Sequence, residues 1–252
     1  MAGGSRAPPF GVQDRSHDMN KSLTRIALTS LALALALGAT GCQSGRPLHV
    51  IKADAGDHAE MGNYDLAVAD YELYLNERRD DSDTRFLYGK ALLQVNRPAD
   101  ARREFAICTE AQPLNDLYWD YLAEAVFQQK DHGELTNLLE QRCRDRGMPA
   151  DYLRVGRFMN RLGHADDAAM AYLTAAKIDQ GKTASIQKEL ADFYGSRGDK
   201  ANQVRRLRMA TFLDPQNKDL AEEVRRMGEI PGPSFWLPPA EAAPVAGVIE
   251  PR

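Results

Sequence analysis

The chain has 252 residues, of which 32 are Lys or Arg and 36 are Asp or Glu, so its formal net charge is −4. Residues 1 to 41 hold four of the basic and two of the acidic residues, which leaves 28 against 34 and a net charge of −6 for the remainder. This acidic balance excludes nucleic-acid binding through bulk charge.

The N-terminal region has two parts with different composition. Residues 1–18 hold glycine, proline and scattered charge and predict no folded element, so we interpret them as an upstream over-extension before a natural start at Met19. A basic stretch follows Met19, and an uncharged run of 16 residues extends from Ile26 to Gly41. That run is short for a membrane-spanning helix. Residues 19–41 are therefore typical of a secretory signal peptide, and a single membrane anchor is the alternative.

The sequence Ala39-Thr40-Gly41-Cys42 resembles the bacterial lipobox, where a signal peptidase cleaves before a lipidated cysteine. The resemblance implies that Cys42 carries acyl chains such as palmitate and that residues 42–47 are a linker. Several acyl chains hold a protein on a membrane where a single chain does so only marginally. Gln43, rather than Asp, follows the cysteine, which resembles sorting to the outer membrane. An incidental cysteine behind an ordinary signal peptide is the alternative.

A 34-residue unit from Ser82 to Asn115 organises the rest of the chain. Counted from Ser82, Gly89 is at position 8, Ala101 at 20, Phe105 at 24 and Pro113 at 32. Two helices approach closely only where small residues replace bulk, and Phe105 fills the space beside that contact. Pro113 ends the second helix. This spacing resembles the tetratricopeptide repeat (TPR).

The spacing recurs upstream and downstream, from about Leu48 to Asn217. The resemblance implies an all-α solenoid of helical hairpins over 48–229, with about five repeats and a C-terminal capping helix. The third unit has Leu135, Leu139 and Arg142 where small, aromatic and small residues are typical, and the fifth has Gln203 at position 20. We expect these two helix pairs to be spaced more widely.

Two features leave alternatives open. Cys108 and Cys143 fall on adjacent second helices, and an oxidising periplasm permits a disulfide. Packed helices, however, lie about 8–10 Å apart, which favours Cys108 as a small core residue.

Residues 230–252 hold six of the 13 prolines and predict an extended or disordered tail. Its Phe235-Trp236-Leu237 either packs back on the last helix or docks a partner.

No catalytic or metal-binding pattern stands out. Gly181-Lys182-Thr183 lacks the preceding glycine of a phosphate-binding loop, because Ala176 occupies that position. The histidines after Cys42 show no metal-ligand spacing, and no serine or cysteine lies in a nucleophile motif. We therefore expect a protein that is not an enzyme and that uses no metal or cofactor.

In proteins that this repeat resembles, the first helix of each unit lines a concave groove. Those positions give the candidate partner-binding residues Lys90, Phe127, Leu153, Arg157, Asn160 and Arg161. Arg157 and Arg161 lie one helical turn apart, and their planar donors suit a carboxylate. We expect a protein or peptide partner, and a plain solvated helix face is the alternative.

Lipoproteins with this layout resemble the pilotins and the tight-adherence pilus lipoproteins (TadD) of pilus and secretion systems. The resemblance implies a scaffold on the outer membrane, facing the periplasm, that assists assembly of such an apparatus. An adaptor that recruits cell-wall hydrolases or assists outer-membrane protein assembly is the alternative. An envelope hydrolase with an unrecognised site is a further one.

Overall fold

The computed structural model describes residues 45–242, so the predicted signal peptide, Cys42 and residues 243–252 lie outside the description. Between residues 45 and 242 the chain forms eleven α-helices and no strand. They are α2 (Leu48–Glu60), α3 (Tyr64–Glu77), α4 (Ser82–Gln94), α5 (Pro98–Ala111), α6 (Asp116–Gln128), α7 (His132–Asp145), α8 (Pro149–Arg161), α9 (Ala165–Asp179), α10 (Ala184–Ser196), α11 (Lys200–Leu213) and α12 (Lys218–Arg226). None of these described helices is long and apolar enough to cross a bilayer.

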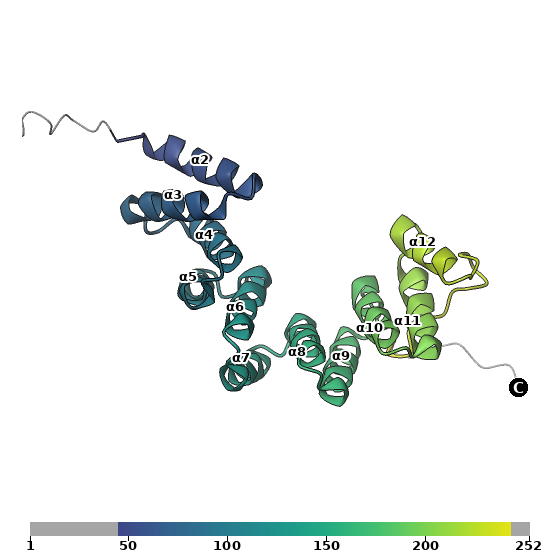
Figure 1. Ribbon diagram of the computed structural model, residues 1–252. Coiled ribbons are helices and arrows are strands. Elements are labelled where there is room, and N and C mark those ends of the chain that lie inside the picture. The colour runs from purple at the N-terminus through teal and green to yellow at the C-terminus, as the bar shows by residue number, and fades with distance from the viewer. Residues whose placement is uncertain (1–44, 243–252) are drawn as a thin grey trace, which may run out of the picture. The chain divides into compact units, whose positions relative to one another are not determined.

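The helices pair in chain order as five hairpins, from α2–α3 to α10–α11, and α12 follows the last pair (Figure 1). The second helix of each hairpin packs on the first helix of the next one. This is the all-α TPR solenoid with a capping helix that the sequence predicts, and the prediction is confirmed.

Close contacts within the hairpins occur where the repeat register places them. A Cβ added to Gly89 would lie 2.5 Å from the ring of Phe105. One added to Gly156 would lie 2.9 Å from the ring of Tyr172. Ala101 is fully buried at the same kind of contact. The small residue therefore makes room for the aromatic ring, as the spacing requires.

The turn inside each hairpin uses a left-handed residue at position 15 of the unit. These residues are Gly62, Asn96, Lys130, Gly163 and Gly198, with φ values of 79°, 56°, 62°, 84° and 76°. Glycine adopts this conformation without the steric cost that a side chain imposes. Among these five residues, Lys130 is therefore the one least suited to the left-handed conformation of the turn.

The two irregular units behave differently from each other. α6 and α7 share a smaller contact than the other hairpins, which agrees with the wider spacing expected for the third unit. In the fifth unit, α10 and α11 pack as closely as α8 and α9, so the widening expected there is wrong. The reason is Gly195: a Cβ at that position would lie 2.5 Å from the side-chain nitrogen of Gln203, so the glycine accommodates the longer residue.

The apolar core continues through the array into the cap and the following segment. Leu220 and Val224 of α12 are buried against α10 and α11. Phe235, in the irregular segment after α12, is only 6% exposed and joins the same core. The interpretation that Phe235-Trp236-Leu237 packs back on the last helices therefore holds.

The two described cysteines are free thiols, so the disulfide alternative is wrong. Cys108 is fully buried, and its thiol lies 3.6 Å from the carbonyl oxygen of Ser82. It acts as the small core residue that position 27 favours.

Candidate functional site

A hollow of about 480 Å³ lies between α6 and α8, the first helices of the third and fourth units. Three of the predicted partner-binding residues, Arg157, Asn160 and Arg161, line it together. The remaining lining residues are Asp120, Tyr121, Glu124, Phe158 and Tyr172. The repeat register thus brings these residue types to one place, with aromatic rings between charged groups.

Both arginines of the hollow already have carboxylate partners on α6. Arg161 donates to Glu124 with both terminal nitrogens, one of them at 3.0 Å. Arg157 lies 3.5 Å from Asp120. The hydrogen bond from Arg161 holds the pKa of Glu124 below its usual value. The hollow is therefore charge-balanced rather than cationic.

Aromatic rings support this charged rim. The guanidinium of Arg161 lies 3.9 Å from the ring centre of Phe127 and 5.2 Å from that of Phe158. Such stacking is worth about 0.5–2 kcal/mol and holds the planar group in one orientation. Phe127 is thus near the hollow but lies beneath Arg161.

A second carboxylate, Glu189 of α10, approaches Arg157. The Nε of Arg157 lies 3.7 Å from Glu189. Burial raises the pKa of Glu189, and the nearby Arg157 opposes that rise. Burial also raises the pKa of Tyr172 to about 12, so this phenol stays protonated and can donate a hydrogen bond at neutral pH.

Two predicted residues lie apart from this hollow. Lys90 lines a neighbouring hollow of about 360 Å³ that shares Tyr121 with the first. Its ammonium group lies 5.8 Å from the ring centres of both Phe86 and Tyr121. Leu153 is 8% exposed and packs in the core, so its assignment as an apolar contact for a partner is corrected.

The arginine spacing suggested a preformed receptor for one carboxylate. The structure differs from this expectation. Asp120 and Glu124 occupy groove positions of the preceding unit and reach the arginines of the next one. Donors and acceptors therefore lie side by side in the hollow, around aromatic rings. Such a surface suits an extended peptide segment, whose backbone carries both kinds of group.

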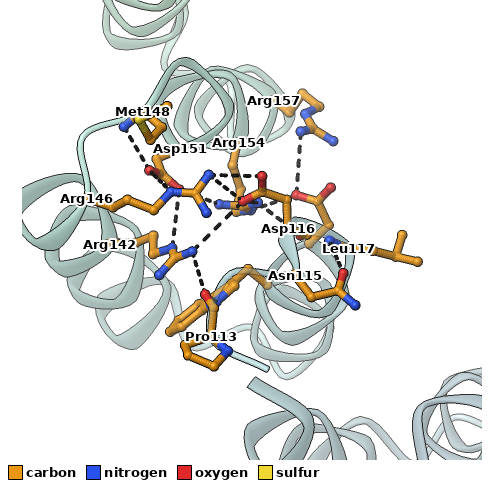
Figure 2. A network of polar contacts seen from close by, with 12 residues as sticks. Pro113, Asn115, Asp116, Leu117, Arg142, Arg146, Met148, Asp151, Arg154 and Arg157 are labelled. Atoms are coloured by element: carbon orange, nitrogen blue, oxygen red, sulfur yellow. Dashed lines mark hydrogen bonds and ion pairs between the residues drawn. The ribbon is translucent and has the colours of Figure 1, made fainter. Parts of the chain in front are cut away.

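A buried charged cluster lies beside the hollow, and the sequence reasoning missed it (Figure 2). Its centre is Asp151 of α8, whose side chain is 0% exposed. Arg154 of the same helix is 2% exposed, and its nitrogens lie 2.6 Å from Asp120 and 3.2 Å from Asp151. Arg142 of α7 and Arg146, which caps the C-terminus of α7, lie 3.3 and 3.2 Å from Asp151.

This cluster joins α6, α7 and α8 where the third hairpin is open. Asp116 completes it, 2.8 Å from Arg146. Three arginines thus face three aspartates, because Asp120 pairs with Arg154. One sequence feature could have predicted this cluster. Asp151 and Arg154 are oppositely charged, lie three residues apart and fall on the inner side of α8. By fixing Arg154 against Asp120, the cluster positions one wall of the hollow.

A second, more apolar cleft has a volume of about 500 Å³. It lies between α7 and α9, over α8, and Tyr152, Val155, Met159 and Met170 line it together with polar residues at its rim.

Across residues 45–242 there is no group of three or more His, Cys, Asp or Glu side chains arranged to hold a metal ion.

No family model matches the chain, and no curated protein matches it. Solved structures with similar folds include a thermophilic TPR protein from Thermus thermophilus, at 20% identity and a TM-score of 0.46, covering 72% of this chain and 98% of that one. MamA from Desulfovibrio magneticus is similar at 12% identity and 0.46, covering 69% and 98%. A TPR repeats protein from Bacteroides fragilis is similar at 18% identity and 0.40, covering 73% and 100%. The fold assignment rests on the helix pairs themselves.

Proposed function

We propose that the chain is a membrane-anchored protein-interaction scaffold of the bacterial cell envelope, whose hollow between α6 and α8 receives an extended segment of a partner protein. The observation that supports this most is the hollow itself. It combines the aromatic rings of Tyr121, Phe158 and Tyr172 with a charged rim held in fixed geometry. Aromatic and arginine side chains are the types that dominate binding energy at protein interfaces.

The anchoring part of the proposal rests on the sequence before the repeats. The lipobox-like stretch ends at Cys42, outside the described residues, and the first helix begins at Leu48. Lipid on Cys42 would hold the repeat array within a few residues of the membrane surface. Mass spectrometry of the protein from its native envelope is expected to find acylated Cys42 with no preceding residue. A mature wild-type chain whose N-terminus is not an acylated Cys42 would contradict the anchor.

We further propose an outer-membrane location facing the periplasm and a role in assembling a pilus or secretion apparatus. Two features support this role: the lipoprotein-like N-terminus and a body built of helical repeats, which present extended side-chain surfaces. Such a scaffold holds a component at the membrane while the component is assembled.

The test is affinity capture from detergent-solubilised envelope with the tagged full chain. Arg157→Ala with Arg161→Ala removes both arginines of the hollow and leaves Glu124 without its arginine partner, whereas Asp120 keeps Arg154. Losing a desolvated charge contact of this kind typically costs about 2–5 kcal/mol at an interface. The double variant is therefore expected to lose the captured protein while keeping its helical content.

The matched control is Arg103→Ala, which removes an exposed arginine paired with Asp100 on α5, away from the hollow. This variant is expected to capture the partner as the wild type does. Equal capture by the folded double variant and by the wild type would exclude the hollow as the binding site. Capture of a cell-wall hydrolase instead of a pilus or secretion component would contradict the assembly role and leave the scaffold function standing.

A further inference from the structure

The segment from residue 230 to 242 lies on the last repeat in the manner of a bound peptide. It has no helix or strand, and it returns from α12 along α11 toward α10 (Figure 1). Phe235 inserts among Leu207, Ala210 and Val224. An apolar side chain buried in a pocket of the helices is the anchor of this contact.

The main chain beside that anchor is recognised as well. The Nε of Arg208 donates to the carbonyl oxygen of Phe235 at 2.6 Å. The backbone nitrogen of Leu237 donates to the carbonyl oxygen of Arg208 at 3.3 Å. One residue of α11 thus binds both a carbonyl and an amide of the segment, which are contacts that any extended peptide provides.

Six residues after Phe235, the carboxylate of Glu241 binds to two buried polar side chains. Glu241 accepts from Arg206 at 2.5 Å and from Gln187 at 3.3 Å. Gln187 is 0% exposed and Arg206 is 9% exposed, and the two also bond to each other at 2.9 Å. Charge-assisted bonds of this type are the strong ones in proteins.

The second repeat shows one direct pairing at the equivalent positions. Arg85 and Glu104 precede Gln187 and Arg206 by three repeats each, and they pair directly with one another. In the fifth repeat the cation is on α11, an amide faces it from α10, and no carboxylate comes from either helix. Among the described residues, the tail supplies the carboxylate that pairs with Arg206.

The turn between α9 and α10 is also adapted to the segment. Gly181 has φ +65°, and a Cβ there would lie 2.5 Å from the Cβ of Pro239 and 3.3 Å from the backbone nitrogen of Ala242. Only glycine therefore permits both the turn and the close passage of the segment. This site and the carboxylate site lie at the same end of the contact.

We propose that α10, α11 and α12 form a second peptide-binding site, specific for an extended segment with an aromatic residue followed six residues later by a carboxylate, and that the chain's own residues 230–242 occupy it as an exchangeable ligand. A partner protein that presents such a segment displaces the tail. The site is separate from the hollow between α6 and α8, so its fate does not decide that of the hollow.

The exchange is tested with the full chain and a fluorescein-labelled peptide of residues 230–242, by fluorescence anisotropy. Phe235→Ala with Glu241→Gln weakens the resident tail. Because a tethered ligand competes at millimolar effective concentration, this chain is expected to bind the peptide at least about tenfold more tightly than the wild type. In the same background, Arg206→Gln is expected to abolish that gain.

The matched control is Arg205→Gln, because Arg205 is exposed and adjacent to Arg206. It is expected to change peptide affinity by less than about twofold, as an exposed charge does. A folded tail-weakened chain that binds no better than the wild type would overturn the proposal, as would equal losses for the two arginine variants. If the double change reduces helical content, the single Glu241→Gln chain takes its place, and absence of any gain there overturns the proposal too.

Discussion

Asp151 is the residue on which the junction between the third and fourth repeats depends most. Its side chain is completely buried, and it accepts from the backbone nitrogen of Met148 at 3.0 Å and from Arg154 at 3.2 Å. Arg142 and Arg146 lie 3.3 and 3.2 Å away. Asp151→Asn keeps the shape of the side chain but leaves three arginines around a neutral amide. Breaking a buried charge arrangement in this way costs about 3–5 kcal/mol.

Asp116 supplies the matched control because it faces the same arginines while its side chain is 40% exposed. Part of its carboxylate is in water, whereas the Oδ1 that faces the arginines is buried, so Asp116→Asn is expected to cost less than Asp151→Asn. Urea unfolding followed by circular dichroism measures both variants against the wild type. A loss below about 1 kcal/mol for Asp151→Asn, or equal losses for the two variants, would refute the view that a buried charged cluster holds this junction.

Three further results are expected. Gly89→Ala should lower the free energy of unfolding in the urea titration by about 1–3 kcal/mol, because the new methyl group meets the ring of Phe105. Gly56→Ala is the control, because open space surrounds this helical position. It should raise the free energy of unfolding by about 0.5–1 kcal/mol. Lys130→Gly should raise the melting temperature, because glycine removes about 1 kcal/mol of strain at a φ of 62°; no gain would contradict the strain. Burial raises the pKa of Cys108 to about 11, so its thiolate is scarce at pH 8 and iodoacetamide should modify it only after unfolding; rapid labelling of the native chain would contradict its burial.

The fold was accessible from the sequence because its determinants are local and repeated. The pairing of Gly89 with Phe105 is 16 residues apart within one hairpin, and the same spacing recurs at Gly156 and Tyr172. Both instances impose the same steric requirement, so one register accounts for the second and fourth hairpins. The fifth unit departed from expectation because Gly195, at another position of the first helix, makes room for Gln203.

The site was only partly accessible, because its chemistry depends on pairs between repeats. Arg157, Asn160 and Arg161 were placed correctly beside one another. That Arg161 is committed to Glu124, 37 residues earlier, depends on how two separate helices cross and on side-chain rotamers. The carry-over of a groove position from one repeat to the next assumes equal exposure in each repeat, whereas Leu153 is buried in the core.

The tail illustrates the same limit at longer range. Phe235 in a proline-rich stretch fits either a free docking segment or a packed one, and composition does not distinguish the two. The deciding partners, Leu207 and Arg208, lie on α11, and Gln187 lies on α10. Their relevance appears only once the segment after α12 is seen to return along these helices.

The central claim, that the hollow between α6 and α8 holds a partner protein, is tested most directly by site-specific photo-crosslinking in intact cells. A photoreactive residue at Asn160 lies in the hollow, and one at Asn137, exposed on α7 and outside it, is the matched control. The account predicts a discrete crosslinked species from position 160 that is absent from position 137 and disappears with Arg157→Ala and Arg161→Ala. No species from position 160, or the same species from both positions, would contradict it.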